Sequence, residues 1–179
     1  MFNPFFKRLG PFNILEVLKS LKINHDKILN KKEVIHDIKD LFSSSTKDIT
    51  FFHSKKYKEI ANKTKASYCI TTNNLKSDLP KNCIPLIVDN VLVSTSLITA
   101  KFYPDAVNDY FDDTVVDITK TEFKKKVKFG KNVLIGSSVV LGSNCSIGHN
   151  TIIEKNVYVG DNCFIGSNSI IRNTLLGNN

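Results

Sequence analysis

The chain has 179 residues, of which 41% are hydrophobic and 23% charged, so it is long enough to bury a core as one domain or as two small ones. The net charge is +8, the basic residues are spread along the chain, and only two of them are arginines. Nucleic-acid binders concentrate Arg and Lys on one face, so we expect no nucleic-acid partner. No apolar run has the length of a transmembrane segment and the N-terminus does not resemble a secretory signal, which predicts a cytoplasmic protein.

The first hundred residues alternate between apolar strands and helices. Asn13 is a candidate N-cap of an amphipathic helix, because Glu16 three residues later completes a capping box. A short basic helix that begins after Ser54 and a helix over residues 90–103 follow further along the chain. The expected strands cover residues 34–38, 49–53, 67–71 and 84–88. These elements predict a small α/β domain over residues 1–104.

The composition changes after this domain. All five prolines lie in the first 104 residues, and seven of the eight glycines lie after residue 129. We therefore expect a linker over residues 105–122 and a second domain over residues 123–179. The four cysteines form no CxxC pair, so reduced, buried thiols are expected rather than disulfides or a metal site.

The second domain is built from a six-residue repeat that begins at Phe129. It reads FGKNVL, IGSSVV, LGSNCS, IGHNTI, IEKNVY, VGDNCF, IGSNSI, IRNTLL. The first slot is always apolar, glycine fills the second slot in six of the eight units, and asparagine fills the fourth slot in six. The fifth slot holds a small or β-branched residue in the first seven units.

Each slot of the repeat has a physical role in a short strand that turns a corner every six residues. The first slot places a large apolar side chain inward, and the fifth slot faces a narrow interior. Asparagine tolerates the left-handed backbone conformation that a corner needs. Neither the period of a helix nor that of an ordinary strand produces this pattern, which therefore predicts a parallel β-helix.

The pattern closely resembles the hexapeptide repeat of left-handed β-helix proteins, in which three hexads form one triangular coil. The resemblance implies an α/β N-terminal domain followed by a left-handed parallel β-helix of about three coils. Residues 18 apart then stack, so Cys145 should lie one layer from Cys163. The last unit is one residue short, because Leu176 follows Ile171 after five residues. No capping segment follows, so we expect an incomplete C-terminus.

The order of the N-terminal elements and the hexads resembles UDP-3-O-acylglucosamine N-acyltransferase of lipid A biosynthesis. That family holds the uridine of a UDP-sugar with an aromatic–x–x–Asn–x–x–Tyr stretch, which aligns with residues 51–57. The resemblance implies substrate-binding roles for Phe51 and Tyr57, whose rings can stack on a pyrimidine. Ser54 takes the position of the family's asparagine. A hydroxyl lacks the paired donor and acceptor of an amide, and Ser54 can alternatively cap a helix.

The family's reaction transfers a 3-hydroxyacyl chain from acyl carrier protein to the 2-amino group of the sugar. A histidine of the β-helix acts as the general base and backbone N–H groups stabilise the oxyanion. The resemblance implies no cofactor and no metal, because the thioester is already activated. It also implies UDP-sugar and acyl carrier protein as partners and an active site formed within a homotrimer.

His149 lies in the sequence CSIGHN, which is similar to the context of the family's catalytic histidine. It nevertheless occupies the third slot of a hexad, which is filled by polar corner residues throughout the repeat, and it comes early in the β-helix. We therefore interpret His149 as a corner residue and expect the general base beyond Asn179. On this interpretation the 179 residues bind UDP-sugar without turning it over.

Two other functions fit the same pattern. The β-helix could serve as a non-catalytic binding or trimerisation module. The chain could also be a sugar-nucleotide acetyltransferase that uses acetyl-CoA, in which case His149 would regain a catalytic role.

Overall fold

The structure is a computed structural model that describes residues 4–23, 32–107, 110–121, 123 and 126–179. The chain divides into two compact units, one spanning Phe6–Asn108 and the other containing Asp109–Asn179. The division lies inside the stretch expected as a linker, of which residues 108, 109 and 122 are outside the described part. Among the described helices, none combines the length and the apolar composition that a membrane crossing requires.

The first unit is built around a parallel sheet of four strands in the order β3-β4-β5-β6. A separate antiparallel pair joins β1 to β2. The strands are β1 Phe12–Asn13, β2 Val34–Ile35, β3 Asp37–Ile38, β4 Asp48–Phe52, β5 Tyr68–Thr71 and β6 Ile84–Ile87. The helices are α1 Ile14–Leu21, α2 Lys58–Ala61, α3 Val91–Phe102 and the 3-10 turns η1 Lys55–Tyr57, η2 Lys76–Asp78 and η3 Pro104–Val107.

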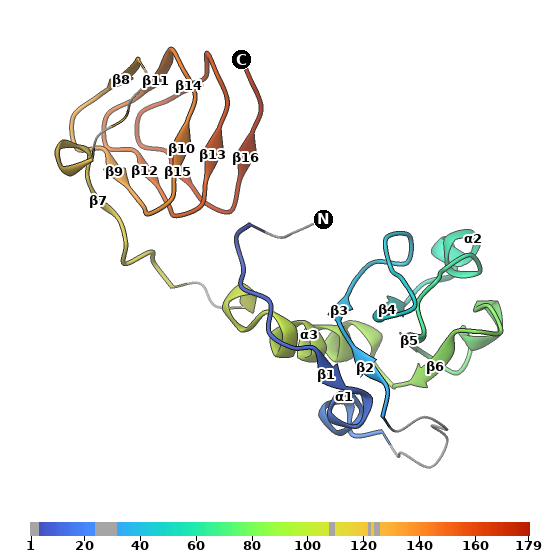
Figure 1. Cartoon of the computed structure of the whole chain (residues 1–179). Coiled ribbons are helices and arrows are strands. Elements are labelled where there is room, and N and C mark those ends of the chain that lie inside the picture. The colour runs from blue at the N-terminus through green and yellow to red at the C-terminus, as the bar shows by residue number, and fades with distance from the viewer. Residues whose placement is uncertain (1–3, 24–31, 108–109, 122, 124–125) are drawn as a thin grey trace. The chain divides into compact units, whose positions relative to one another are not determined.

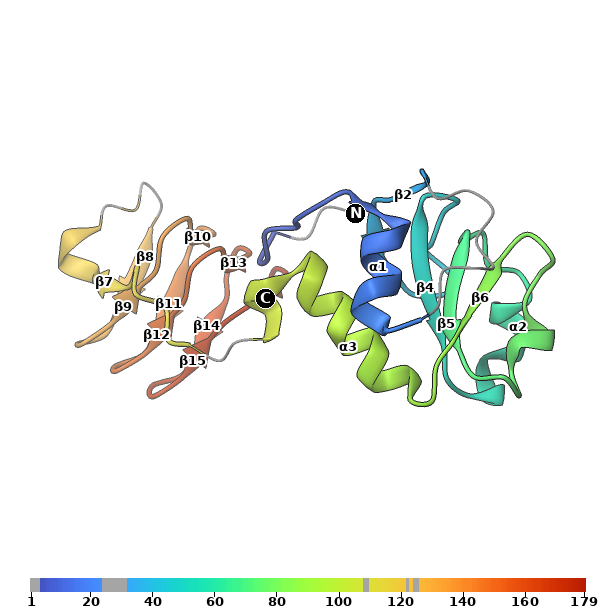
Figure 2. The same ribbon diagram turned by 90° about the horizontal axis from the view of Figure 1, so that it is seen from below.

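The two faces of the parallel sheet bury separate cores. On one face α1 and α3 pack against the sheet, and Figure 2 shows both helices on the same side of β4 and β5. On the other face lies a smaller cluster that includes Phe52, Ala61, Cys69 and Cys83. Successive residues of a strand point to opposite faces, which is why the neighbours Phe51 and Phe52 belong to different cores.

Most of the elements expected in the first unit are confirmed. Asn13 Oδ1 accepts the Leu15 N–H at 2.8 Å and the Asn13 N–H donates to Glu16 Oε1 at 3.2 Å, so the predicted capping box begins α1. The single strand expected over residues 34–38 is wrong. The chain changes partner at His36, since β2 pairs with β1 while β3 joins the parallel sheet.

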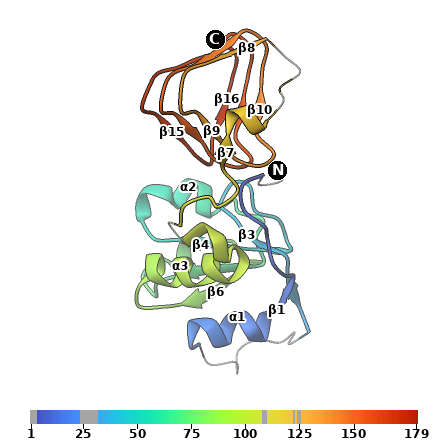
Figure 3. The same cartoon turned by 90° about the vertical axis from the view of Figure 1, so that its left-hand side faces the viewer.

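The second unit is a left-handed parallel β-helix of three coils, as predicted (Figure 1). Each coil contributes one strand to each of three parallel sheets, in the orders β8-β11-β14, β9-β12-β15 and β10-β13-β16, and β7 adds an antiparallel strand beside β9. In Figure 3 the β-helix is viewed along its axis, so that the coils lie over one another. The strands are β7 Val116–Asp117, β8 Val127–Phe129, β9 Leu134–Ile135, β10 Val140–Leu141, β11 Cys145–Ile147, β12 Ile152–Ile153, β13 Tyr158–Val159, β14 Phe164–Ile165, β15 Ile170–Ile171 and β16 Leu175–Leu176, with a 3-10 turn η4 Ile118–Lys120 after β7.

The register of the coils confirms the eighteen-residue stacking. Ser146 pairs with Phe164, which places Cys145 and Cys163 in adjacent layers, where both are buried free thiols. The last coil is one residue shorter, because Tyr158 pairs with Leu175, seventeen residues away. The corner before β16 accordingly lies at Asn173, one residue earlier than the repeat predicts.

The corners show why asparagine recurs in the fourth slot. Seven asparagines of the β-helix have φ between 49° and 61°, a region that asparagine tolerates. Their side chains also stack, since Asn132 Nδ2 donates to Asn150 Oδ1 at 3.0 Å and Asn150 Nδ2 donates to Asn168 Oδ1 at 3.2 Å. These seven residues are Asn132, Asn144, Asn150, Asn156, Asn162, Asn168 and Asn173.

In each hexad the backbone N–H of the third-slot residue is left unpaired by the sheets. This backbone N–H needs an acceptor at the corner, which the third-slot side chain of the next coil can supply. At two of the three corners the acceptor comes from the β-helix itself. The pairs are Lys131 N to His149 Nδ1, His149 N to Ser167 Oγ, Ser143 N to Asp161 Oδ1, and Asp161 N to Asn178 Oδ1, at 2.6 to 3.0 Å.

The remaining corner takes its acceptors from the segment before the β-helix. A lysine side chain cannot accept a hydrogen bond, so Lys155 cannot serve Ser137 in the coil below. Thr114 Oγ1 accepts the Ser137 N–H at 2.9 Å, and Asp112 Oδ2 accepts the Lys155 N–H at 2.6 Å. The segment over residues 112–114 therefore seals this corner.

Asp112→Ala is expected to destabilise the β-helix by about 2 kcal/mol, because it removes a buried side chain and leaves the Lys155 N–H without its acceptor. Burial opposes ionisation of Asp112, but hydrogen bonds from Thr114 and from the Lys155 N–H outweigh it and lower the pKa of this carboxyl. The stabilisation from ionised Asp112 is therefore complete above the ordinary aspartate pKa of about 4 and is lost as the pH falls through the lowered value.

Urea unfolding followed by circular dichroism at several pH values measures this effect. The matched variant Thr119→Ala removes the hydroxyl of an exposed residue that bonds Asp117, so it should change the free energy of unfolding little. An Asp112→Ala chain as stable as the wild type at neutral pH would show that this corner needs no acceptor.

Candidate functional site

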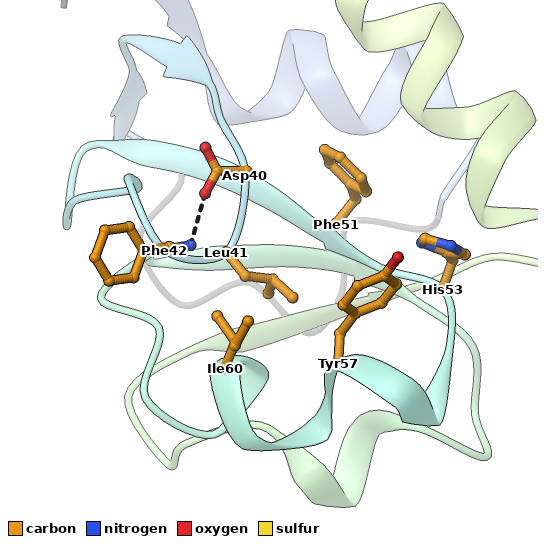
Figure 4. A pocket seen from close by; sticks show the side chains of 7 residues that line it. All are labelled: Asp40, Leu41, Phe42, Phe51, His53, Tyr57 and Ile60. Atoms are coloured by element: carbon orange, nitrogen blue, oxygen red, sulfur yellow. Dashed lines mark hydrogen bonds between the residues drawn. The ribbon is translucent and has the colours of Figure 1, made fainter.

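A cavity of about 280 Å³ lies at the carboxyl ends of β3 and β4, within the first unit (Figure 4). Its lining residues lie at or just after the ends of these two neighbouring parallel strands, or belong to the turn and helix after β4. In open parallel sheets, ligands bind at the carboxyl ends of the strands, so the position is suited to binding. The lining residues are Asp40, Leu41, Phe42, Phe51, His53, Tyr57 and Ile60.

Three rings meet at one end of the cavity. The imidazole of His53 lies 6.4 Å from the Phe51 ring, centroid to centroid, with 26° between their planes, and 5.4 Å from the Tyr57 ring. Phe51 is half-buried and also packs against the core under α1 and α3. Tyr57 is 37% exposed, so its ring is accessible to a ligand. Flat apolar rings at the mouth of a cavity are suited to stacking on a nucleobase.

Ser54 does not line the cavity. Its hydroxyl accepts the Lys56 N–H at 3.4 Å and so caps η1, the turn that carries Tyr57. The structure thus brings Phe51 and Tyr57 together and uses Ser54 to hold the turn between them. The helix-cap alternative for Ser54 matches this arrangement.

The opposite end of the cavity is anionic. Asp40 accepts hydrogen bonds from the Ser43 hydroxyl and from the Ser43 and Phe42 N–H groups. These bonds, led by the one from the Ser43 hydroxyl, outweigh burial and hold the pKa of Asp40 below its ordinary value. Asp40 therefore stays ionised and acts only as an acceptor at neutral pH.

His149 lies in the other unit, at an exposed corner of the β-helix. Its Nδ1 accepts the Lys131 N–H at 2.8 Å, which leaves the proton of the neutral ring on Nε2. A general base needs an unprotonated nitrogen that faces the substrate, and in His149 that nitrogen is already engaged. This geometry supports the interpretation of His149 as a corner residue.

His149→Ala is expected to cost about 0.5–1 kcal/mol of β-helix stability, because one exposed N–H loses its acceptor. In an active enzyme that contains this sequence, turnover should stay within a few-fold of wild type, as measured by a radiolabelled acyl-transfer assay. Loss of a general base typically lowers the rate by about 10² to 10⁴, so a fall of that size would make His149 catalytic.

Sequence reasoning missed most of the cavity. The segment from Asp40 to Phe42 follows a two-residue strand with no periodic pattern, and only the parallel pairing of β3 with β4 brings it beside Phe51. His53 offered a usable signal, since it is the first residue after a buried parallel strand.

Comparisons with known proteins match both units. Residues 33–100 match the family model described as UDP-3-O-(3-hydroxymyristoyl) glucosamine N-acyltransferase, LpxD, and residues 126–159 and 138–173 match the bacterial transferase hexapeptide repeat. Among curated relatives, UDP-3-O-acylglucosamine N-acyltransferase of Rickettsia canadensis (strain McKiel) is 35% identical over 101 residues. The proteins of the same name from Rickettsia akari (strain Hartford) and Rickettsia felis (strain ATCC VR-1525 / URRWXCal2) are 32% and 34% identical over 103 residues.

Each of these alignments covers 55% of this chain and 29% of the relative. The cavity lies inside the matched domain, since all its lining residues fall between residues 33 and 100. Residues 33–100 are therefore similar to the domain that the model of this acyltransferase family describes, and in this chain a stretch similar to the hexapeptide repeats of bacterial transferases follows it.

Proposed function

We propose that the chain binds the UDP-sugar substrate of an N-acyltransferase of lipid A biosynthesis, with the uridine in the cavity at the ends of β3 and β4. The observation that carries this proposal is the joint lining of that cavity by Phe51 and Tyr57 inside the matched domain. Their rings would stack on the uracil, while Leu41 and Ile60 supply further apolar contacts in the cavity.

The reaction proposed for the complete enzyme is transfer of a 3-hydroxyacyl chain from acyl carrier protein to the 2-amino group of UDP-3-O-acylglucosamine. The amine attacks the thioester carbonyl, the thiolate of the carrier leaves, and a general base takes the proton of the amine. No cofactor is proposed, because the thioester supplies the activated acyl group. Since Nδ1 of His149 is engaged at a corner, the base is not assigned to this chain, and the 179 residues should bind without turnover.

The β-helix is proposed to assemble three copies of the chain. Hexapeptide-repeat transferases are typically trimeric, and outward-facing apolar side chains of this β-helix form columns along two of its sheets. Exposed contiguous apolar surface marks contact sites. One column contains Val140, Tyr158 and Leu175, and the other ends in Ile170, which is 64% exposed.

Isothermal titration of the 179-residue chain tests the binding proposal. UDP-N-acetylglucosamine should bind with 1:1 stoichiometry per chain, and UDP should compete with it, whereas GDP-mannose, which carries a purine in place of uracil, should bind at least tenfold more weakly. Equal affinity for the two sugar nucleotides, or no heat with either, would refute uridine recognition. Sedimentation velocity of the same sample reports whether three copies associate.

A further inference from the structure

His53 occupies a position in the cavity that the proposed uridine site does not yet use. It follows β4 directly, its side chain is exposed, and its ring lies against both Phe51 and Tyr57 (Figure 4). A ligand whose base stacks on these two rings must therefore pass beside the imidazole where it leaves the cavity. His53 is placed to touch whatever is attached to the base.

The charges around the cavity fix which way a nucleotide lies. Ionised Asp40 lies at one end, among Leu41, Phe42 and Ile60, and it would repel a phosphate. At the other end, the two lysines of η1 follow His53 in the chain, and Lys56 Nζ lies 5.9 Å from the centroid of the Tyr57 ring. A diphosphate is therefore favoured on the His53 side and the base toward the Asp40 side.

The supply of hydrogen-bond donors narrows the candidates for a phosphate contact to two side chains, one of which is His53. Of the described side chains that line the cavity, only the imidazole of His53 and the hydroxyl of Tyr57 can donate a hydrogen bond. The hydroxyl of Ser54, which accepts the Lys56 N–H, lies outside the lining. A phosphate oxygen that leaves the cavity beside the rings thus meets the N–H of His53.

We propose that His53 donates a hydrogen bond to the diphosphate of the bound nucleotide and so sets the orientation of the ligand, with the base toward Asp40 and the phosphates toward η1. This inference rests on the proposed function, because it assumes that a uridine nucleotide occupies the cavity. It adds a binding residue and a direction that neither the hexapeptide pattern nor the Phe51–Tyr57 pair specifies.

Titrations of uridine and UDP into the same variants isolate the phosphate contact. Wild-type chain should bind UDP at least tenfold more tightly than uridine, since a hydrogen bond to a charged group typically contributes a factor of about ten or more. His53→Phe keeps a ring against Phe51 and Tyr57 but removes the donor, so it should weaken UDP about tenfold and leave uridine within twofold. His53→Gln, which keeps an N–H donor, should recover part of the affinity for UDP.

The matched control is His36→Phe, the same chemical change at an exposed histidine outside the cavity lining, and it should alter neither affinity. Wild-type chain that binds neither ligand would refute the proposed function itself. If wild-type chain binds both, but His53→Phe weakens neither or weakens both equally, the inference about His53 fails while the uridine site stands. A preference for UDP that disappears in Lys55→Ala or Lys56→Ala but survives in His53→Phe would also overturn it.

Discussion

Replacing Gly142 by alanine should destabilise the β-helix by about 3 kcal/mol, although the change adds a single methyl group. A Cβ atom at Gly142 would lie within 2.5 Å of the Asp161 backbone nitrogen and still closer to the carbonyl of Gly160 in the coil above. Real Cβ atoms do not approach backbone atoms so closely, so one of the two coils must shift.

The coils cannot shift without losing hydrogen bonds. The Gly142 N–H donates to the Val159 carbonyl at 2.8 Å, the Gly160 N–H donates to the Leu176 carbonyl at 3.0 Å, and the Gly160 carbonyl accepts from Cys145 Sγ at 3.0 Å. Separating the coils to admit a methyl group would lengthen all three hydrogen bonds at once. The destabilisation should therefore exceed that of a typical overpacked side chain with room to rotate.

Gly166→Ala is the matched control, because it makes the same change in the same slot of the repeat. A Cβ atom at Gly166 would meet nothing within 4 Å, and its φ is not positive, so alanine should be tolerated or slightly stabilising. Hydrogen-exchange mass spectrometry separates the effects, since it reports protection of the β-helix peptides independently of the first unit. Equal protection in the two variants would mean that the close approach of the coils does not require glycine in the second slot.

The β-helix could be predicted from the sequence in unusual detail because each residue meets the residue eighteen positions away. A local six-residue pattern therefore specifies long-range contacts directly, as it does for Cys145 and Cys163. What the pattern could not show is where a slot lacks its usual chemistry. Lys155 fills a third slot whose side chain should accept the Ser137 N–H, and the structure supplies Thr114 from outside the repeat instead. A lysine in an acceptor slot was the available signal.

The cavity was predicted only in part, for a different physical reason. Phe51 and Tyr57 were identified by resemblance to a motif within one continuous stretch, and both line the cavity. Its other wall comes from the loop after β3, whose side chains reach the site through strand pairing, which no local pattern encodes. The role of Ser54 in binding stays a prediction, since its hydroxyl is engaged in capping η1.

Tyr57→Ala should weaken binding of UDP by about thirtyfold, because stacking of a base on an aromatic ring contributes about 1–3 kcal/mol. Tyr57 is the better test of stacking than Phe51, because Phe51 also packs against the core and its loss would disturb the sheet. The Tyr57 side chain is 37% exposed and belongs to none of the buried clusters, so its removal should change the free energy of unfolding by less than about 0.5 kcal/mol.

Tyr57→Phe separates the ring from its hydroxyl. It should keep affinity for uridine within about threefold of wild type, since the stacking face is preserved and at most one hydrogen bond is lost. Calorimetric titration of UDP and of uridine into both variants and the wild type measures the difference. If alanine binds uridine as tightly as tyrosine does, the base does not stack on this ring, and the cavity then recognises some other part of its ligand. If Tyr57→Phe lowers the affinity as much as Tyr57→Ala does, the hydroxyl rather than the ring makes the decisive contact. The cavity then recognises a polar group of the ligand instead of the flat face of its base.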